Sequence, residues 1–198
     1  DFDGDGDMDA MFGEIGGRWT LARNDGTSFT VSDQANFGDF GWSSVVSGDF
    51  NGDGRADLAA LAGDRTWWVW HSTDDGLESA KYWGSWRQRD SWQDVGVGDF
   101  NNDGRDDIIG RTDDARLWVG SATDTRFHTW TWAKGWVQRA DWRNVMVVDM
   151  NADGLPDQVG QAKDSTWWYS LNTGENNFRN FFWQHQEVDG FFKLQETD

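Results

Sequence analysis

The chain has 198 residues, a length typical of one folded domain, and its 16 Trp and 13 Phe can supply a core although only 37% of the residues are hydrophobic. Against 17 Lys and Arg stand 35 Asp and Glu, and the formal charge of −18 would repel both a nucleic-acid backbone and an anionic membrane surface. Nucleic acid is therefore excluded as a partner, the absence of Cys excludes disulfides and thiolate metal sites, and the apolar runs are too short for membrane insertion.

Four acidic segments recur along the chain at steps of 48, 50 and 50 residues, each with the pattern D-x-[D/N]-x-D-G-x-x-D. The period also holds outside these segments, because an aromatic residue stands seven positions before the leading Asp and a Trp or Leu ten positions after the closing Asp: Trp42, Trp92 and Trp142; Trp19, Trp67, Leu117 and Trp167. The sequence therefore predicts one unit over residues 1–198, built of four repeats that begin at residues 1, 49, 99 and 149.

Within one period, four short segments rich in β-branched, aromatic or aliphatic residues are separated by turn residues. They are 43–48, 58–62, 66–71 and 79–86, and the turn Asp74-Asp75-Gly76 precedes the last of them. Four strands in about fifty residues is the size of a propeller blade, and no segment has a convincing helical period with caps. The expected fold class is all-β, a β-propeller of four-stranded antiparallel blades.

Residues 191–198 match residues 92–99 in their aromatic residue, their Val or Leu and their terminal Asp. They are predicted to act as the first strand of a next or closing blade. Two alternatives remain open at this point: a complete four-bladed ring, or a part of a larger propeller. In the second case, self-association of copies could complete the blade or the ring.

The acidic segments have the composition of calcium-binding loops. Positions 1, 3, 5 and 9 offer side-chain oxygens and position 7 can offer its carbonyl, which is the mixture that a hard cation such as Ca²⁺ prefers. Position 6 is always a glycine, as expected where a chain that curls around one ion needs a left-handed residue: Gly6, Gly54, Gly104 and Gly154. The EF-hand is excluded because its Glu at position 12 is replaced by Phe12, Ala60, Gly110 and Gly160.

Segments 45–58 and 95–108, which read VVSGDFNGDGRADL and VGVGDFNNDGRDDI, resemble the FG-GAP or VCBS repeats of integrin α-subunit propellers and of many secreted bacterial proteins. Segments 67–69 and 83–86 are similar to a Trp-rich bacterial variety found in large surface or secreted proteins. The resemblance implies a β-propeller, an extracellular setting, and one Ca²⁺ in the loop that joins the first two strands of each blade, about four in all. The implied ligands, with position 7 contributing its carbonyl, are Asp1, Asp3, Asp5, Asp7 and Asp9; Asp49, Asn51, Asp53, Arg55 and Asp57; Asp99, Asn101, Asp103, Arg105 and Asp107; Asp149, Asn151, Asp153, Leu155 and Asp157.

The regularly spaced Trp residues are interpreted as packing between blades, because large rigid rings fill wedge-shaped gaps. Five others are less regularly placed, and an exposed Trp beside polar groups could hold the apolar face of a sugar. These candidate ligand-binding residues are Trp70, Trp83, Trp130, Trp132 and Trp183.

An enzyme would need a nucleophile with a base, an open metal site or a paired acid and base in one pocket. The only histidines are His71, His128 and His185, at unequal places in their repeats, and most carboxylate pairs lie inside the acidic loops. We therefore expect no catalysis. A calcium-stabilised binding or adhesion module that recognises a cell-surface protein or glycan ranks first, a lectin second, and a structural repeat of a long surface protein or fibre third.

Overall fold

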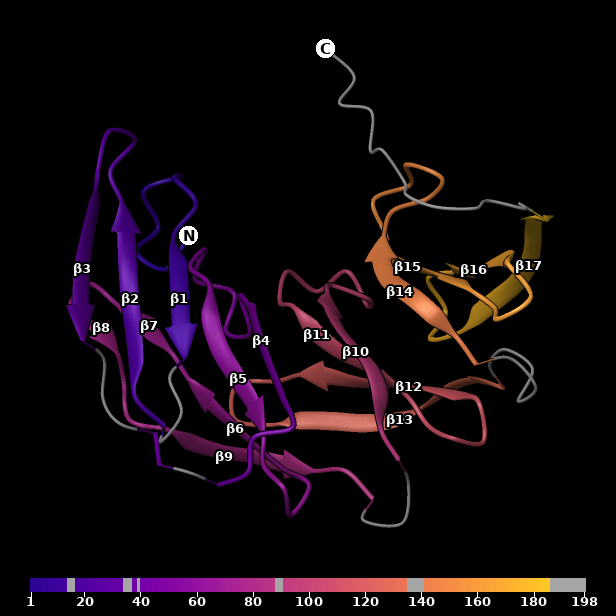
Figure 1. Ribbon diagram of the computed structural model, residues 1–198, viewed down its shortest axis with the longest axis horizontal. Coiled ribbons are helices and arrows are strands. Elements are labelled where there is room, and N and C mark those ends of the chain that lie inside the picture. Colours follow the sequence, from indigo (N-terminus) through magenta and orange to yellow (C-terminus); the bar gives the residue numbers. More distant parts are fainter. Residues whose placement is uncertain (14–16, 34–36, 39, 88–90, 135–140, 186–198) are drawn as a thin grey trace.

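The structure is a computed structural model, and it describes residues 1–13, 17–33, 37–38, 40–87, 91–134 and 141–185 (Figure 1). All regular secondary structure in these ranges is β, in four larger sheets and one short hairpin. None of the described residues forms a helix that is long and apolar enough to cross a membrane. The predicted all-β fold class is confirmed.

Each larger sheet corresponds to one period of the sequence repeat. In the last three sheets the first strand stands directly before the leading Asp of an acidic loop, so it lies at the end of the preceding repeat. The first sheet contains β1 (Ala10–Gly13), β2 (Trp19–Asn24) and β3 (Phe29–Asp33). The second contains β4 (Ser44–Gly48), β5 (Asp57–Leu61), β6 (Thr66–Trp70) and β9 (Lys81–Ser85), with a small hairpin of β7 (Ser72–Thr73) and β8 (Gly76–Leu77) beside it. The third contains β10 (Gln93–Gly98), β11 (Asp107–Arg111), β12 (Arg116–Ala122) and β13 (Phe127–Lys134). The fourth contains β14 (Arg143–Val148), β15 (Asp157–Gln161), β16 (Thr166–Asn172) and β17 (Phe178–His185).

The strands of each sheet pair antiparallel in chain order, so that every sheet is a simple meander of the kind expected for a propeller blade. In the last three blades the acidic loop joins the first two strands, and its closing Asp faces the residue before its leading Asp. These pairs are Gly48–Asp57, Gly98–Asp107 and Val148–Asp157. The first blade has three strands in the described part of the chain, and residues 191–198, predicted as a first strand, lie outside that part.

The four strands predicted for one period, over residues 43–86, are confirmed to within one or two residues at each end, as β4, β5, β6 and β9. The β7–β8 hairpin around the predicted Asp74–Gly76 turn was not expected. Its two-residue strands are too short to produce a recognisable alternation of apolar and polar side chains.

The blades follow one another along the long axis of the molecule, with β1–β3 at one end of the row and β14–β17 at the other (Figure 1). Neighbouring blades touch through their first strands, β4 with β10 and β10 with β14, and through their fourth strands, β9 with β13 and β13 with β17. The described residues therefore form an open row of propeller-like blades and not a closed ring.

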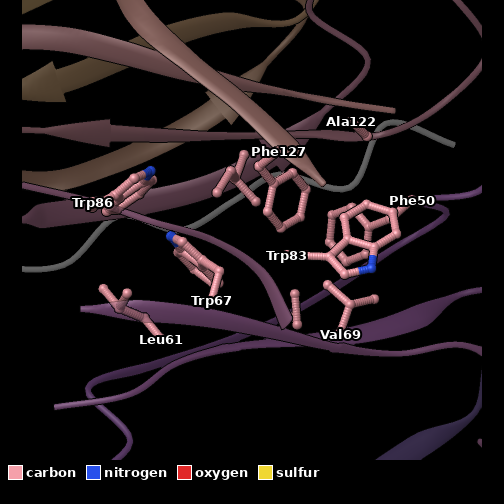
Figure 2. Close-up of a cluster of buried hydrophobic side chains, with 10 residues drawn as sticks. Phe50, Leu61, Trp67, Val69, Trp83, Trp86, Ala122 and Phe127 are labelled. Atoms are coloured by element: carbon pink, nitrogen blue, oxygen red, sulfur yellow. The ribbon is translucent and has the colours of Figure 1, made fainter. Parts of the chain in front are cut away.

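Large aromatic side chains fill the space between the second and third blades (Figure 2). Trp67 is fully buried, and its ring packs edge-on against Trp86 at a centroid distance of 5.0 Å and against Phe127 of the next blade at 5.9 Å. Trp167 and Leu117, at the same place in their own repeats, are also buried. The interpretation of the regularly spaced aromatic positions as packing residues agrees with this geometry.

Candidate metal sites in the acidic loops

The leading Asp of each loop organises the loop backbone. Its carboxylate accepts hydrogen bonds from the backbone N–H of position 6 and from that of position 4 or 5. For Asp49, the N–H groups of Gly52 and Asp53 donate to Oδ1 at 2.7 and 3.1 Å, and that of Gly54 donates to Oδ2 at 2.7 Å. The same arrangement holds around Asp1, Asp99 and Asp149. The loops thus curl around this carboxylate, as expected of a cation loop.

The chain turns left-handed twice in every loop. The glycine at position 6 has a φ between 84° and 95° in all four loops, which confirms the conformation predicted for it. Position 4 is also left-handed, and it is occupied by Gly4, Gly52, Asn102 (φ 57°) and Ala152 (φ 58°). The sequence did not predict this second left-handed residue, because position 4 varies between loops. Ala152 in particular is not a residue type that favours positive φ.

The closing Asp ties the loop to the second and third strands. Asp57, Asp107 and Asp157 are fully buried, and in each the Oδ1 atom accepts the backbone N–H of the residue fifteen positions later, at 2.8 Å. In the second and fourth loops, Oδ2 accepts the backbone N–H of position 2, that of Phe50 at 3.2 Å and that of Met150 at 2.9 Å. The closing carboxylate is therefore a fixed, buried anion at the base of the loop.

The third loop leaves one of these carboxylate oxygens without a partner. Here the backbone N–H of Phe100 donates to Gly98 O at 2.9 Å, and Asp107 Oδ2 is buried with no hydrogen bond. Burial, together with the smaller effect of the charges of Asp103 and Asp99, raises the pKa of the Asp107 carboxyl from 3.8 to about 8, and the nearby backbone N–H groups of Ala122 and Phe100 offset only part of this rise. Burial likewise raises the pKa of Asp157. A buried anion among other anions is costly unless a cation or a proton neutralises it, so this donor set fits a bound cation.

In the first loop, three carboxylates lie close enough to one another to share one cation. Oxygen atoms of Asp1, Asp3 and Asp9 lie within 4.8 Å of one another, while Asp5 Oδ1 accepts the backbone N–H of Asp7. In the other loops position 3 is an Asn whose amide donates to the carboxylate of position 5: Asn51 to Asp53, Asn101 to Asp103 and Asn151 to Asp153. The first loop thus brings three carboxylates together, whereas the other three loops have an amide at position 3.

The side chains of position 7 point toward the turn before the last strand of the blade. The Nη2 atom of Arg55 lies 2.6 Å from Asp74 Oδ1, and Nη1 of Arg105 lies 3.3 Å from Asp124 Oδ1. Leu155 lies beside Gly174 in the same turn of the fourth blade. The sequence predicted only the backbone carbonyl of position 7 as a ligand. Because the side chain points to the turn, the carbonyl remains available to bind the cation.

Neighbouring loops are linked by backbone hydrogen bonds. The N–H of position 8 donates to the carbonyl of the leading Asp one loop earlier, from Ala56 to Asp1 and from Asp106 to Asp49, both at 2.7 Å. The carboxylate of Asp106 also accepts the N–H of Asp49 at 2.9 Å. In the fourth loop position 8 is Pro156, which has no N–H, and the side chain of Asn172 instead bonds Phe100 O at 2.7 Å. The four loops therefore form a continuous row along one side of the array.

The five candidate sugar-binding Trp residues have different environments. Trp83 and Trp132 are buried in the cores between blades, at 1% and 4% exposure, so their rings offer no face to a ligand and the prediction is wrong for them. Trp70 is also buried, but it forms part of the wall of a hollow lined by Phe37, Phe40, Trp42 and Trp68. Trp130 is partly exposed and Trp183 is half exposed. Burial in a repeat protein depends on the neighbouring blade, which the local sequence does not reveal.

The two histidines whose side chains the structure describes have different surroundings. His71 Nδ1 lies 2.9 Å from Asp57 Oδ2 and packs its ring against Trp83, so this histidine supports the base of the second loop. His128 is exposed beside Trp130, and the side chain of His185 lies outside the described part of the chain.

The comparison with known families agrees with this geometry. The FG-GAP-like repeat matches residues 1–60 and, in an overlapping second match, residues 49–110. The two matches together span residues 1–110, more than half of the 198-residue chain, and each includes two acidic loops. No curated protein matches the chain. The repeated blades, their acidic loops and this match place the chain in the FG-GAP-like repeat family.

Proposed function

We propose that the chain is a non-catalytic binding or adhesion module that works outside the cell, with one Ca²⁺ in each of its four acidic loops. FG-GAP-like repeats are typically non-catalytic and often extracellular, which supports the setting. Its partner is a cell-surface protein or a glycan. Calcium acts by holding each loop closed and the blades in register, so that metal binding and folding stabilise each other.

The observation that carries the proposal is the buried carboxylate of Asp107. Its unpartnered Oδ2 and its raised pKa describe a carboxyl group whose charged form lacks the positive charge that would stabilise it. Lys and Arg side chains do not reach it among the described residues, and the flanking ligand candidates are the anions Asp99 and Asp103. A divalent cation would neutralise all three groups at once.

In each loop the ligands would come from the side chains of positions 1, 3, 5 and 9 and from the carbonyl of position 7. Extracellular calcium modules of this kind bind with a Kd on the order of 10⁻⁴ to 10⁻³ M, which matches the millimolar calcium outside cells. The left-handed residues at positions 4 and 6 hold the loop in the curled conformation in advance.

The test is a thermal melt in calcium and in excess chelator for the unaltered chain and for Asp53→Ala and Asp103→Ala. At a calcium concentration of about 100 Kd, each filled site adds about 2.7 kcal/mol, and a chain of this size melts about 2–4 °C higher per kcal/mol. Each variant should therefore lose about 5–10 °C of the rise produced by calcium. Asp113→Ala, an exposed Asp outside the loops, is the matched control and should keep the full rise. An unchanged rise in both loop variants would contradict the proposal.

A lectin function is the second candidate, and one structural feature favours it. A hollow of about 340 Å³ on the second blade is lined by aromatic side chains with Glu78 and Ser79 at its border. Phe40 is 64% exposed there, and the rings of Trp42 and Trp68 are partly exposed, so that aromatic faces stand next to polar groups. Aromatic faces beside hydrogen-bonding groups are suited to the apolar face of a sugar ring.

A glycan array in calcium separates the two functions. The lectin hypothesis predicts hits that disappear in Trp68→Ala, whereas Tyr82→Ala, an exposed aromatic that faces Trp68 outside the hollow, should retain them. The absence of any hit would leave protein-binding adhesion as the proposed function. A spacer role in a surface protein or fibre would show neither kind of binding.

A further inference from the structure

The aromatic hollow on the second blade has walls that stand at steep angles to one another. Its volume is about 340 Å³, and all of its lining residues lie between residues 37 and 80, away from both ends of the chain. The ring centroid of Trp42 lies 5.4 Å from that of Phe40 and 5.6 Å from that of Trp70, with interplanar angles of 66° and 74°. The rings therefore surround a space and do not form a flat stack.

The indole N–H groups of the two partly exposed Trp rings in the hollow are already used within the chain. Trp42 Nε1 donates to Gly38 O at 3.1 Å, and Trp68 Nε1 donates to Thr66 Oγ1 at 2.9 Å. The charged or hydroxyl side chains that line the hollow are those of Glu78 and Ser79. Since buried hydroxyl groups need hydrogen-bond partners, the hollow is best suited to a ligand that needs few of them.

The charge around the hollow favours a cation. Among the described residues that line it, none is Lys or Arg, and Glu78 is a carboxylate. The hydrogen bond from Lys81 Nζ to Glu78 Oε2, at 2.7 Å, and the charge of Lys81 lower the pKa of Glu78, so this carboxyl is ionised at neutral pH. Lys81 lines a neighbouring polar depression and not the hollow. The negative faces of the aromatic rings add to the attraction for positive charge.

The equivalent ring of the third blade already holds a cation. Trp118 stands fifty residues after Trp68, and the guanidinium carbon of Arg87 lies 5.2 Å from the centroid of its ring, which is cation–π distance. The residue fifty positions before Arg87 is Phe37, whose ring packs against Trp70 at a centroid distance of 4.4 Å. The second blade therefore keeps the aromatic ring but has no cationic side chain at this place in its sequence.

We propose that the hollow binds the trimethylammonium group of a choline carried by a cell-surface glycan. This group is a compact cation without N–H donors, so it gains from aromatic faces and needs no hydrogen bond. A glycan is the expected carrier because the acidic chain repels an anionic membrane surface. The inference rests on the binding role proposed above, but not on calcium in the loops, and it names the group that the hollow recognises.

An NMR titration of the indole signals compares choline with 3,3-dimethylbutan-1-ol, its uncharged carbon isostere. Choline should bind saturably and with a Kd about tenfold or more below that of the isostere, because only the cation is attracted by the ring faces and by Glu78. Equal affinity for the two compounds, no saturable binding of choline, or tighter binding of a neutral monosaccharide would overturn the proposal.

Two variants locate the site. Trp68→Leu keeps an apolar side chain but removes the aromatic face, and Glu78→Gln removes the charge of a side chain that is 44% exposed. Each should weaken choline binding about fivefold or more, whereas Tyr82→Leu, which removes an exposed ring outside the hollow, should not change it. Thermal melts check that the variants fold, and Glu78→Gln alone decides if Trp68→Leu does not. Unchanged affinity in Glu78→Gln would overturn the proposal.

The carrier of the group is tested with a choline-bearing oligosaccharide, phosphatidylcholine vesicles and a trimethyllysine peptide. The oligosaccharide should bind most tightly, and a preference for the vesicles or the peptide would overturn the glycan as the occupant. Choline binding should persist in chelator, because the lining residues lie outside the acidic loops. A calcium-dependent melt without choline binding would therefore refute this inference alone, and choline binding without any calcium effect would refute only the calcium sites.

Discussion

Replacing Asp107 with Asn should stabilise the metal-free protein, which is the opposite of what a polar substitution in a core usually does. The pKa of this carboxyl is raised from 3.8 to about 8 by burial and by neighbouring carboxylates. At pH 7 the unfolded chain has ionised the group but the folded chain has not, which costs the fold about 4 kcal/mol at about 1.4 kcal/mol per pH unit above 3.8. The neutral amide of Asn removes that cost.

Part of the gain is lost, because the amide nitrogen that replaces the unpartnered Oδ2 atom carries two N–H donors, one more than the protonated carboxyl has. An unsatisfied buried donor costs about 1–3 kcal/mol, whereas the hydrogen bond from Ala122 to Oδ1 survives. The net stabilisation of Asp107→Asn in chelator is then about 1–3 kcal/mol, which at about 2–4 °C per kcal/mol raises the melting temperature by about 2–12 °C. In saturating calcium the order reverses, because the variant has lost a ligand of the third site.

Thermal melts in chelator from pH 4 to pH 8 complete this test. Because the folded-state pKa is above the unfolded one, the contribution of Asp107 to stability is full below pH 3.8 and is lost as the pH rises toward about 8. The unaltered chain should lose stability over this window more steeply than Asp107→Asn. A variant that is less stable than the unaltered chain in chelator, with the same pH dependence and the same response to calcium, would refute the reasoning.

Three further substitutions or conditions give separate outcomes. Ala152→Gly relieves a left-handed residue (φ 58°) and should raise the free energy of unfolding by about 0.5–1 kcal/mol in urea titrations, whereas a loss of stability would refute the strain. Phe50→Ala removes a fully buried ring whose centroid lies 5.3 Å from that of Phe127 of the next blade. It should lower the free energy of unfolding by about 3–5 kcal/mol in the same assay, and a loss below about 1 kcal/mol would contradict that packing. Hydrogen bonds from the side chains and backbone N–H groups of Thr27 and Ser28 lower the pKa of Asp25 to about 2. The stabilisation of the β2–β3 turn by the Asp25 carboxylate should therefore persist at pH 4 and be lost as the pH falls through about 2. An NMR titration of this carboxyl with a midpoint near about 4 would contradict the prediction.

The sequence allowed the blade to be predicted well, because its signals are local. The closing Asp and the apolar run after it define the second strand, and the aromatic run 66–71 defines the third, so that β5 and β6 appear where they were expected. The left-handed glycine of position 6 also follows from one residue type at one place in each loop. Such features need no knowledge of the neighbouring blade.

The features that the sequence did not reveal depend on contacts between repeats. Phe50 and Phe100 at position 2 of their loops are fully buried because Phe127 and Phe178 of the following blades cover them. Trp83 was predicted as a candidate sugar-binding residue because the sequence does not show its contact with the next blade. The packing of Phe127 against Trp83 places the ring in the core. The links between position 8 of one loop and the leading Asp of the previous one likewise cross between blades.

The most direct test of the central claim is a count of bound calcium by equilibrium dialysis of the metal-free protein at pH 7. We predict saturable binding of about four ions per chain, with a Kd on the order of 10⁻⁴ to 10⁻³ M, and one ion fewer in Asp107→Asn. Binding of no calcium at millimolar concentrations, or the same number of ions in the variant, would contradict the assignment of the acidic loops as calcium sites.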